Sequence, residues 1–151
     1  TQVLAKFVKL NKWPPFFEKI IFMFQKEVGD RIIAKPNTKN YSRISVLANF
    51  RLEIISSFKI SQKCFFPSPK VESQIIVFKP KSKINAKIRK IENLEKITNI
   101  FFSNKRKMIN KNLKKVLSDK KIESISNLNV KIRPENVSPE IYYKITNLSE
   151  N

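Results

Sequence analysis

The segment Phe65-Phe66-Pro67-Ser68-Pro69-Lys70-Val71-Glu72-Ser73 combines residue types that could hold a planar group. Each proline fixes its own φ and biases the residue before it toward extended geometry. A phenylalanine presented from such a stiff loop, directly before a strand, can form a flat wall for a planar ring. Only one of the two adjacent phenylalanines can face such a site, and the other would then pack as a core aromatic at the end of the sheet.

A second group of residues could bind phosphates. The densest basic cluster in the chain consists of Lys105, Arg106, Lys107, Lys111, Lys114 and Lys115. On a helix that begins near residue 104, residues 107, 111, 114 and 115 would share one face. Such a face could make several phosphate contacts, and its affinity would then fall steeply with added salt. The same spacing fits a solvated helix surface equally well.

The whole chain is strongly basic. Its 151 residues include 31 Lys and Arg against 12 Asp and Glu, which gives a net charge of +19. This imbalance favours a polyanionic partner, with nucleic acid ahead of an anionic membrane. No apolar run is long enough to span a membrane, and no signal peptide is visible. A lysine-rich composition inflated by genome bias is the alternative, and the many Lys, Asn and Ile residues fit it.

The residues that the chain lacks exclude several chemistries. It has no histidine, which removes His-based acid–base catalysis, His metal ligands and Ser-His or Cys-His nucleophilic sites, and we expect no metal. Cys64 is the single cysteine, so a reducing, cytoplasmic setting is the simpler interpretation. Gly29 is the single glycine, whereas nucleotide-type pockets need glycines where the backbone turns against the ligand. Either the chain is not an enzyme, or its cofactor half lies upstream of Thr1.

Periodicity predicts the elements that would position these residues in the first part of the chain. Strand, helix, helix, strand, loop, strand is the order found in the second half of a doubly wound α/β sheet. The expected elements are a helix over 3–10, a buried parallel strand over 20–24, helices over 26–34 and 44–50, and strands over 51–60 and 71–78.

The second part reads as a small helical unit. The composition changes at residues 79–83, and no convincing strand follows. Apolar spacing predicts helices over 91–101, 108–117 and 138–148, the last with Ser138 as N-cap and Pro139 at its first position. We therefore expect two domains, residues 1–80 and residues 81–151.

Five sets of residues resemble the ribosomal RNA adenine N6-dimethyltransferases, and the bacterial small-subunit enzymes in particular. The sets follow the family's order and span almost the whole chain. They are Phe24-Gln25-Lys26-Glu27-Val28 with Arg31; Tyr41-Ser42-Arg43-Ile44-Ser45-Val46; the F-x-P-x-P-x-V-x-S pattern of residues 65–73; Phe102 with Arg106-Lys107, Asn110, Asn112 and Leu113; and Arg133-Pro134-Glu135.

This resemblance implies an enzyme of ribosome biogenesis that moves methyl groups from S-adenosylmethionine to the N6 atoms of two adjacent adenosines near the 3′ end of small-subunit (16S) rRNA. It implies the C-terminal half of a Rossmann-like methyltransferase sheet, followed by a small all-α domain that binds rRNA. In the family, the glycine-rich cofactor loop, the acidic ribose-binding residue and the Asn-Leu-Pro-Tyr catalytic motif lie in the N-terminal half. None of them occurs here, so we expect this chain to bind no cofactor and to be inactive by itself.

The resemblance also implies roles for single residues. Alignment on Pro67, Pro69 and Val71 selects Phe65 as the residue that stacks on the extruded target adenine, opposite the tyrosine of the absent motif. Lys70 would approach the rRNA backbone or remain solvated. The family usually carries paired arginines where this chain has Lys105-Arg106-Lys107, which leaves fewer bidentate phosphate contacts.

Three other functions remain open from the sequence. The chain could be a non-catalytic RNA-binding or ribosome-assembly module. It could also belong to a resistance-type methylase of large-subunit rRNA or to a transcription-factor paralogue. The Arg133-Pro134-Glu135 segment favours the small-subunit enzyme.

Overall fold

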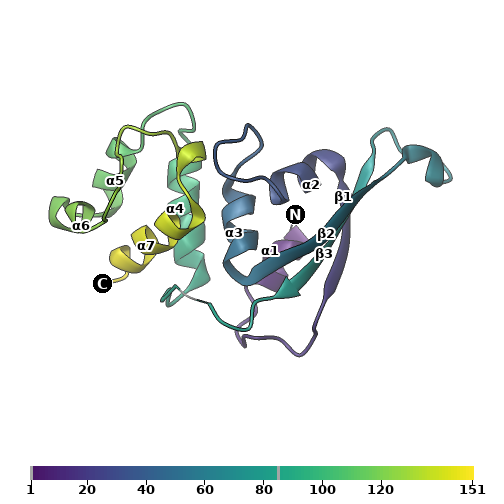
Figure 1. Cartoon of the computed structure of the whole chain (residues 1–151), viewed down its shortest axis with the longest axis horizontal. Coiled ribbons are helices and arrows are strands. Elements are labelled where there is room, and N and C mark those ends of the chain that lie inside the picture. Colours follow the sequence, from purple (N-terminus) through teal and green to yellow (C-terminus); the bar gives the residue numbers. More distant parts are fainter. Residues whose placement is uncertain (1, 85) are drawn as a thin grey trace.

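The computed structural model describes residues 2–84 and 86–151. Figure 1 shows a small sheet with helices against it at one end of the molecule and a purely helical part at the other. The predicted α/β class, with helices alone in the second part, is therefore confirmed within the described residues.

The sheet has three strands in the order β1-β3-β2. Strand β1 (Ile20–Gln25), strand β2 (Leu52–Ile60) and strand β3 (Ser73–Pro80) lie close to their predicted positions. Strand β3 is central and pairs antiparallel with both neighbours. The connection between β2 and β3, residues 61–72, therefore projects from one end of the sheet (Figure 1).

The prediction that β1 is a buried parallel strand is wrong for the described residues. Strand β1 pairs antiparallel with β3, and its burial alternates along the strand. Ile20 is buried, whereas Ile21 is 65% and Met23 is 54% exposed. A continuous apolar run is typical of strands that are covered on both faces. Here the helices cover one face of β1, so every second side chain points to solvent.

Helices α1 (Gln2–Val8), α2 (Lys26–Ile32) and α3 (Arg43–Arg51) follow the predicted helices. Helix α3 lies at the centre of the molecule, because it packs against α1, α2 and β2 on one side and against the helical part on the other. Four of its side chains are buried hydrophobic ones, namely Val46, Leu47, Ala48 and Phe50. Figure 1 shows α3 between the sheet and helices α4 and α7.

The helical part contains α4 (Ile91–Phe102), α5 (Asn110–Val116), α6 (Asp119–Glu123) and α7 (Pro139–Ser149). Short 3-10 helices, η1 (Gln62–Cys64) and η2 (Pro134–Asn136), complete the elements of the described residues. Helix α7 begins as predicted, with Ser138 at the N-cap and Pro139 at its first position. Helix α6 was not predicted.

The prediction of a helix that begins near residue 104 is wrong. Residues 103–107 form turns and a bend, and α5 begins only at Asn110. The amide of Ile109 donates to the carbonyl of Ile132, at 2.9 Å, and the amide of Asn110 donates to that of Val130. These amides are thus used by a distant segment instead of by a preceding helical turn. Lys107 therefore lies outside the helix.

The two parts of the chain share one hydrophobic core. The hydroxyl of Tyr143 in α7 donates to the carbonyl of Val46 in α3, at 3.1 Å, and the rings of Phe50 and Tyr143 lie 5.1 Å apart. The indole N–H of Trp13 donates to the carbonyl of Lys81, which fastens the connection between the parts. Because the core is continuous, the division into residues 1–80 and 81–151 stays a prediction.

Candidate nucleic-acid interface

The β2–β3 connection, residues 61–72, is held by a few hydrogen bonds at its tip and base. At the tip, the hydroxyl of Ser68 donates to the carbonyl of Gln62, at 2.9 Å, and the amide of Phe65 donates to the same carbonyl. At the base, the amide of Lys26 donates to the carbonyl of Glu72, at 2.8 Å. The connection thus joins the start of α2 as well as the two strands.

The two phenylalanines of this connection differ in exposure. Phe66 is fully exposed, and Phe65 is half-buried. Lys70, on the same connection, is exposed. Both rings are therefore within reach of a planar group that approaches the β2–β3 connection. The choice of Phe65 over Phe66 stays a prediction.

The residues of the Lys105-Arg106-Lys107 cluster have different surroundings. The side chains of Arg106 and Lys107 are exposed, and among the described residues neither makes a hydrogen bond or an ion pair. Lys105 is half-buried. Its ammonium group donates to the carbonyl of Lys39, at 2.8 Å, and lies 3.2 Å from the carboxylate of Glu135. The structure thus separates Lys105 from the two cations that follow it.

Helix α5 carries the other three cations of the predicted cluster. Lys111, Lys114 and Lys115 are exposed, and their spacing of three and four residues places them on one side of the helix. Lys114 lies 3.9 Å from Asp119, but both side chains are more than two thirds exposed, so solvent screens the pair. These three lysines remain available to an anionic partner.

A polar cleft of about 780 Å³ lies where the two parts of the chain meet. We call it the basic cleft, and its cations are Arg31, Lys39, Arg43 and Lys105. Arg43, at the start of α3, donates to the side-chain oxygen of Asn99 in α4, at 3.0 Å. The cleft therefore has one wall from each part of the chain.

Sequence reasoning missed Lys39 and Arg43 as candidate phosphate ligands. Arg43 belongs to the Tyr41-Ser42-Arg43 segment that resembles the family, and this was the signal that could have found it. Lys39 lies in a loop without periodicity, so only its position in the folded chain brings it to the cleft.

The three tyrosines of the chain are buried in its core. Tyr41, Tyr142 and Tyr143 are buried, and burial raises the pKa of each hydroxyl far above its ordinary value. The hydroxyl of Tyr142 donates to the carbonyl of Pro134, at 2.8 Å. These groups stay protonated at neutral pH.

The single glycine, Gly29, lies inside α2 against the side chain of Gln74, so it provides no tight turn beside a ligand. In the described part of the chain, no three His, Cys, Asp or Glu side chains gather where a metal could bind. None of its helices is both long and apolar enough to cross a membrane.

Comparison with known proteins identifies the family. A family model for ribosomal RNA adenine dimethylase matches residues 1–151. Ribosomal RNA small subunit methyltransferase A of Pelagibacter ubique is 38% identical over 147 residues, which are 96% of this chain and 55% of that protein. The protein of the same name from Ehrlichia canis is 40% identical over 145 residues, 91% of this chain and 54% of that protein. The chain thus spans about half the length of these curated relatives.

Two solved structures have a similar fold. A dimethyladenosine transferase from Plasmodium falciparum aligns with a TM-score of 0.67 and 21% identity over 87% of this chain and 57% of its own. The 23S rRNA methyltransferase ErmE aligns with a TM-score of 0.60 and 18% identity over 92% of this chain and 57% of its own. At these identities the likeness concerns the fold alone. Because the family model covers every residue and the relatives exceed 30% identity, the chain belongs to the ribosomal RNA adenine dimethylase family.

Proposed function

We propose that this chain is the C-terminal part of a cytoplasmic enzyme that dimethylates the N6 atoms of two adjacent adenosines near the 3′ end of 16S rRNA in the small ribosomal subunit. The observation that carries this proposal is the match of the family model to residues 1–151. The names of the relatives from Pelagibacter ubique and Ehrlichia canis support the small subunit as the substrate.

The contribution of this chain is to hold the target base and the rRNA. Phe65 forms one wall for the extruded adenine, and stacking on one aromatic ring contributes about 1–3 kcal/mol. The residues that bind S-adenosylmethionine and those that act on N6 would come from outside residues 1–151, and the position of the single glycine, Gly29, inside α2 rather than in a turn supports this.

The rRNA backbone binds to exposed cations on both parts of the chain. The observations that support this are the excess of 31 Lys and Arg over 12 Asp and Glu and the exposure of the side chains named below. Each cation that contacts a phosphate releases counterions, which makes affinity salt-dependent. The proposed contacts are Lys39, Arg43, Lys70, Arg106, Lys107, Lys111, Lys114 and Lys115.

The test is transfer of tritiated methyl groups from S-adenosylmethionine to isolated small ribosomal subunits. The enzyme is the gene product that carries this chain, with the coding sequence upstream of Thr1 included. Phe65→Ala should lower the transfer rate at least about tenfold, the factor that corresponds to losing roughly 1.4 kcal/mol of stacking, and should leave binding of the methyl donor near normal. Phe66→Ala is the matched control. A rate that falls with Phe66→Ala and not with Phe65→Ala would assign the wall to Phe66.

A second candidate substrate is large-subunit rRNA. The sequence leaves this substrate open as an alternative, and the likeness to ErmE, a 23S rRNA methyltransferase, concerns the fold alone. Large subunits and small subunits are therefore offered separately in the same assay. Transfer to large subunits alone would replace the small-subunit proposal with this one.

A further inference from the structure

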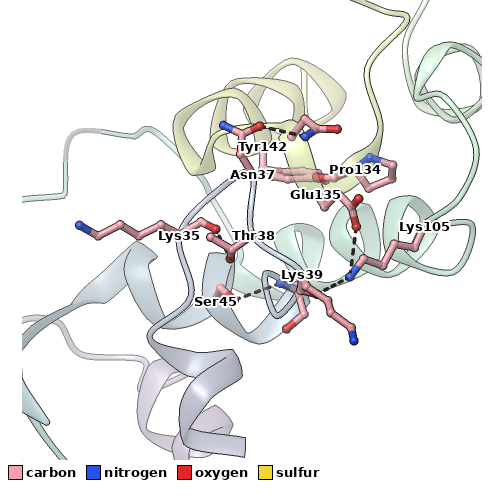
Figure 2. Close-up of polar contacts among 11 residues, drawn as sticks. Lys35, Asn37, Thr38, Lys39, Ser45, Lys105, Pro134, Glu135 and Tyr142 are labelled. Carbon is pink, nitrogen blue, oxygen red and sulfur yellow. Dashed lines mark hydrogen bonds and ion pairs between the residues drawn. The ribbon is translucent and has the colours of Figure 1, made fainter. Parts of the chain in front are cut away.

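The loop that joins α2 to α3, residues 35–41, lies against the helical part of the chain. Figure 2 shows Asn37 and Lys39 of this loop beside Glu135 of η2 and Lys105. The amide of Asn37 donates to the carbonyl of Glu135, at 2.9 Å, and the side-chain amide of Asn136 donates to the side-chain oxygen of Asn37, also at 2.9 Å. The loop and the helical part are thus joined through main-chain and side-chain atoms of the same residue, Asn37.

Within the loop itself few bonds define the backbone. The amide of Tyr41 donates to the carbonyl of Thr38, at 3.1 Å, and the hydroxyl of Thr38 donates to the carbonyl of Lys35, at 2.7 Å. Asn37 has φ of 67°, a left-handed conformation that asparagine tolerates better than most residues do. A short loop with one left-handed residue and two internal bonds depends on outside contacts for its shape.

Lys105 supplies two of those contacts. Its ammonium group lies between the carbonyl of Lys39 and the carboxylate of Glu135, at 2.8 and 3.2 Å, as Figure 2 shows. The hydroxyl of Tyr142 donates to the carbonyl of Pro134, the residue before Glu135. The ammonium group of Lys105 therefore has one hydrogen-bond acceptor and one ion-pair partner inside the protein.

The neighbouring cations have no such partners. Among the described residues, the exposed side chains of Arg106 and Lys107 make neither hydrogen bonds nor ion pairs. A phosphate could bind these two side chains without breaking a hydrogen bond or an ion pair inside the protein. To bind Lys105 it would first have to break the bond to Lys39 or the pair with Glu135.

We propose that Lys105 is a positioning residue, which holds loop 35–41 against the helical part so that Lys39 and Arg43 face the basic cleft together, and that it does not itself contact an rRNA phosphate. Arg43 follows the loop directly, at the start of α3, and bonds to Asn99 across the cleft. Lys105 and Glu135 fix the same loop from the helical part. The width of the basic cleft thus depends on two contacts of the Lys105 ammonium group. One is its hydrogen bond to the carbonyl of Lys39, and the other is its ion pair with the carboxylate of Glu135. This inference rests on the proposed function only for the statement that the cleft binds rRNA.

Hydrogen exchange in the full chain tests the positioning role without RNA. Lys105→Met removes both contacts and keeps the aliphatic stem. We expect the amides of Asn37 and Tyr41, which donate hydrogen bonds in the folded chain, to exchange about tenfold faster, the change that corresponds to one or two lost hydrogen bonds. Lys107→Met removes an equal charge from the same cluster and should leave exchange of these amides unchanged. Lys105→Arg can bond to both acceptors and should restore slow exchange.

Salt dependence of RNA binding tests the second half of the inference. The probe is a hairpin from the 3′ end of small-subunit rRNA. Lys107→Met should reduce the slope of log affinity against log salt by about 0.7 to 0.9, the contribution of one phosphate contact. Lys105→Met should weaken binding through the displaced loop, and Lys105→Arg should restore it.

Glu135→Gln distinguishes a role of Lys105 in positioning the loop from a general electrostatic attraction between the chain and RNA. It raises the net charge by one, so attraction alone would strengthen RNA binding. If Lys105 acts through Glu135, this variant should instead speed exchange of the Asn37 and Tyr41 amides and weaken binding. Equal loop exchange in Lys105→Met and wild type, together with a slope reduced as in Lys107→Met, would overturn the inference. If the wild-type chain does not bind the hairpin, the proposed function fails, and the exchange result still decides whether Lys105 holds the loop.

Discussion

Gly29 in α2 and Gln74 in β3 fit against each other so closely that a Cβ atom on Gly29 would lie 2.8 Å from Cδ and 3.0 Å from Cβ of Gln74. Gln74 is buried, and its side-chain oxygen has no hydrogen-bond partner among the described residues. The one glycine of the chain thus serves packing between a helix and the central strand of the sheet.

This relationship predicts that Gly29→Ala lowers the free energy of unfolding by about 1–2 kcal/mol, because the added methyl group overpacks the contact. In a Gln74→Ala background the same change should cost less, because Cδ and Oε1 of residue 74 are gone and only its Cβ, at 3.0 Å, still limits the space. Urea unfolding of the four proteins in this cycle measures the coupling. Equal effects of Gly29→Ala in both backgrounds would mean that the two residues do not interact.

The hydroxyls of two buried tyrosines predict opposite effects of the same substitution. The hydroxyl of Tyr41 has no hydrogen-bond partner among the described residues, whereas that of Tyr142 donates to the carbonyl of Pro134. Tyr41→Phe should raise the free energy of unfolding by up to about 1 kcal/mol, and Tyr142→Phe should lower it by about 1–2 kcal/mol. Thermal and urea unfolding compare the pair. Destabilisation by Tyr41→Phe would reveal a partner for that hydroxyl.

The buried tyrosines also predict a loss of stability in alkali. Burial raises the pKa of Tyr41, Tyr142 and Tyr143 above the ordinary value of 10.0. Above pH 10 the unfolded chain therefore releases protons that the folded chain keeps, so the free energy of unfolding falls as the pH rises further. Tyrosinate absorbance should appear together with loss of helical circular dichroism.

The unfolded chain in urea is the control for this titration, and its tyrosines should ionise near pH 10. Tyrosinate that appears near pH 10 while the helical signal is intact would show that a hydroxyl is accessible in the folded chain.

The exposed lysines predict a salt-dependent affinity for RNA. Replacing Lys107, Lys111 and Lys114 together with Met should reduce the slope of log affinity against log salt by about 2 to 3, one unit or slightly less for each lost phosphate contact. The measurement is hairpin binding over a range of salt concentrations. Replacing Lys120, Lys121 and Lys131 instead, which lie outside the proposed surface, should change the slope less. Equal slopes for the first triple variant and the wild type would mean that these lysines form only a solvated surface.

Most of the elements could be predicted from the sequence because their signals are local. The three strands and six of the seven α-helices follow from apolar spacing, prolines and an N-cap serine, within the residues that the structure describes. The exposure of Ile21 and Met23 could not be predicted, because it depends on which face of the sheet the helices cover.

The surroundings of the basic cluster could not be predicted, because they come from distant segments. The amide of Ile109 bonds to the carbonyl of Ile132, which replaces the expected start of a helix with turns. Lys105 meets Lys39 across 66 positions of sequence, and no spacing rule connects them. Charge composition therefore predicted a basic surface, but not which of its cations is engaged inside the protein.

We propose that this chain belongs to an enzyme that dimethylates small-subunit rRNA. The most direct test of this proposal expresses the gene product that carries residues 1–151, upstream coding sequence included, in cells that lack their own small-subunit rRNA adenine dimethylase. Mass spectrometry of digested rRNA should then find two adjacent N6,N6-dimethyladenosines near the 3′ end of 16S rRNA, and far less of them with Phe65→Ala. Unmodified 16S rRNA in cells that make the folded protein, or dimethyladenosine in large-subunit rRNA alone, would contradict the account.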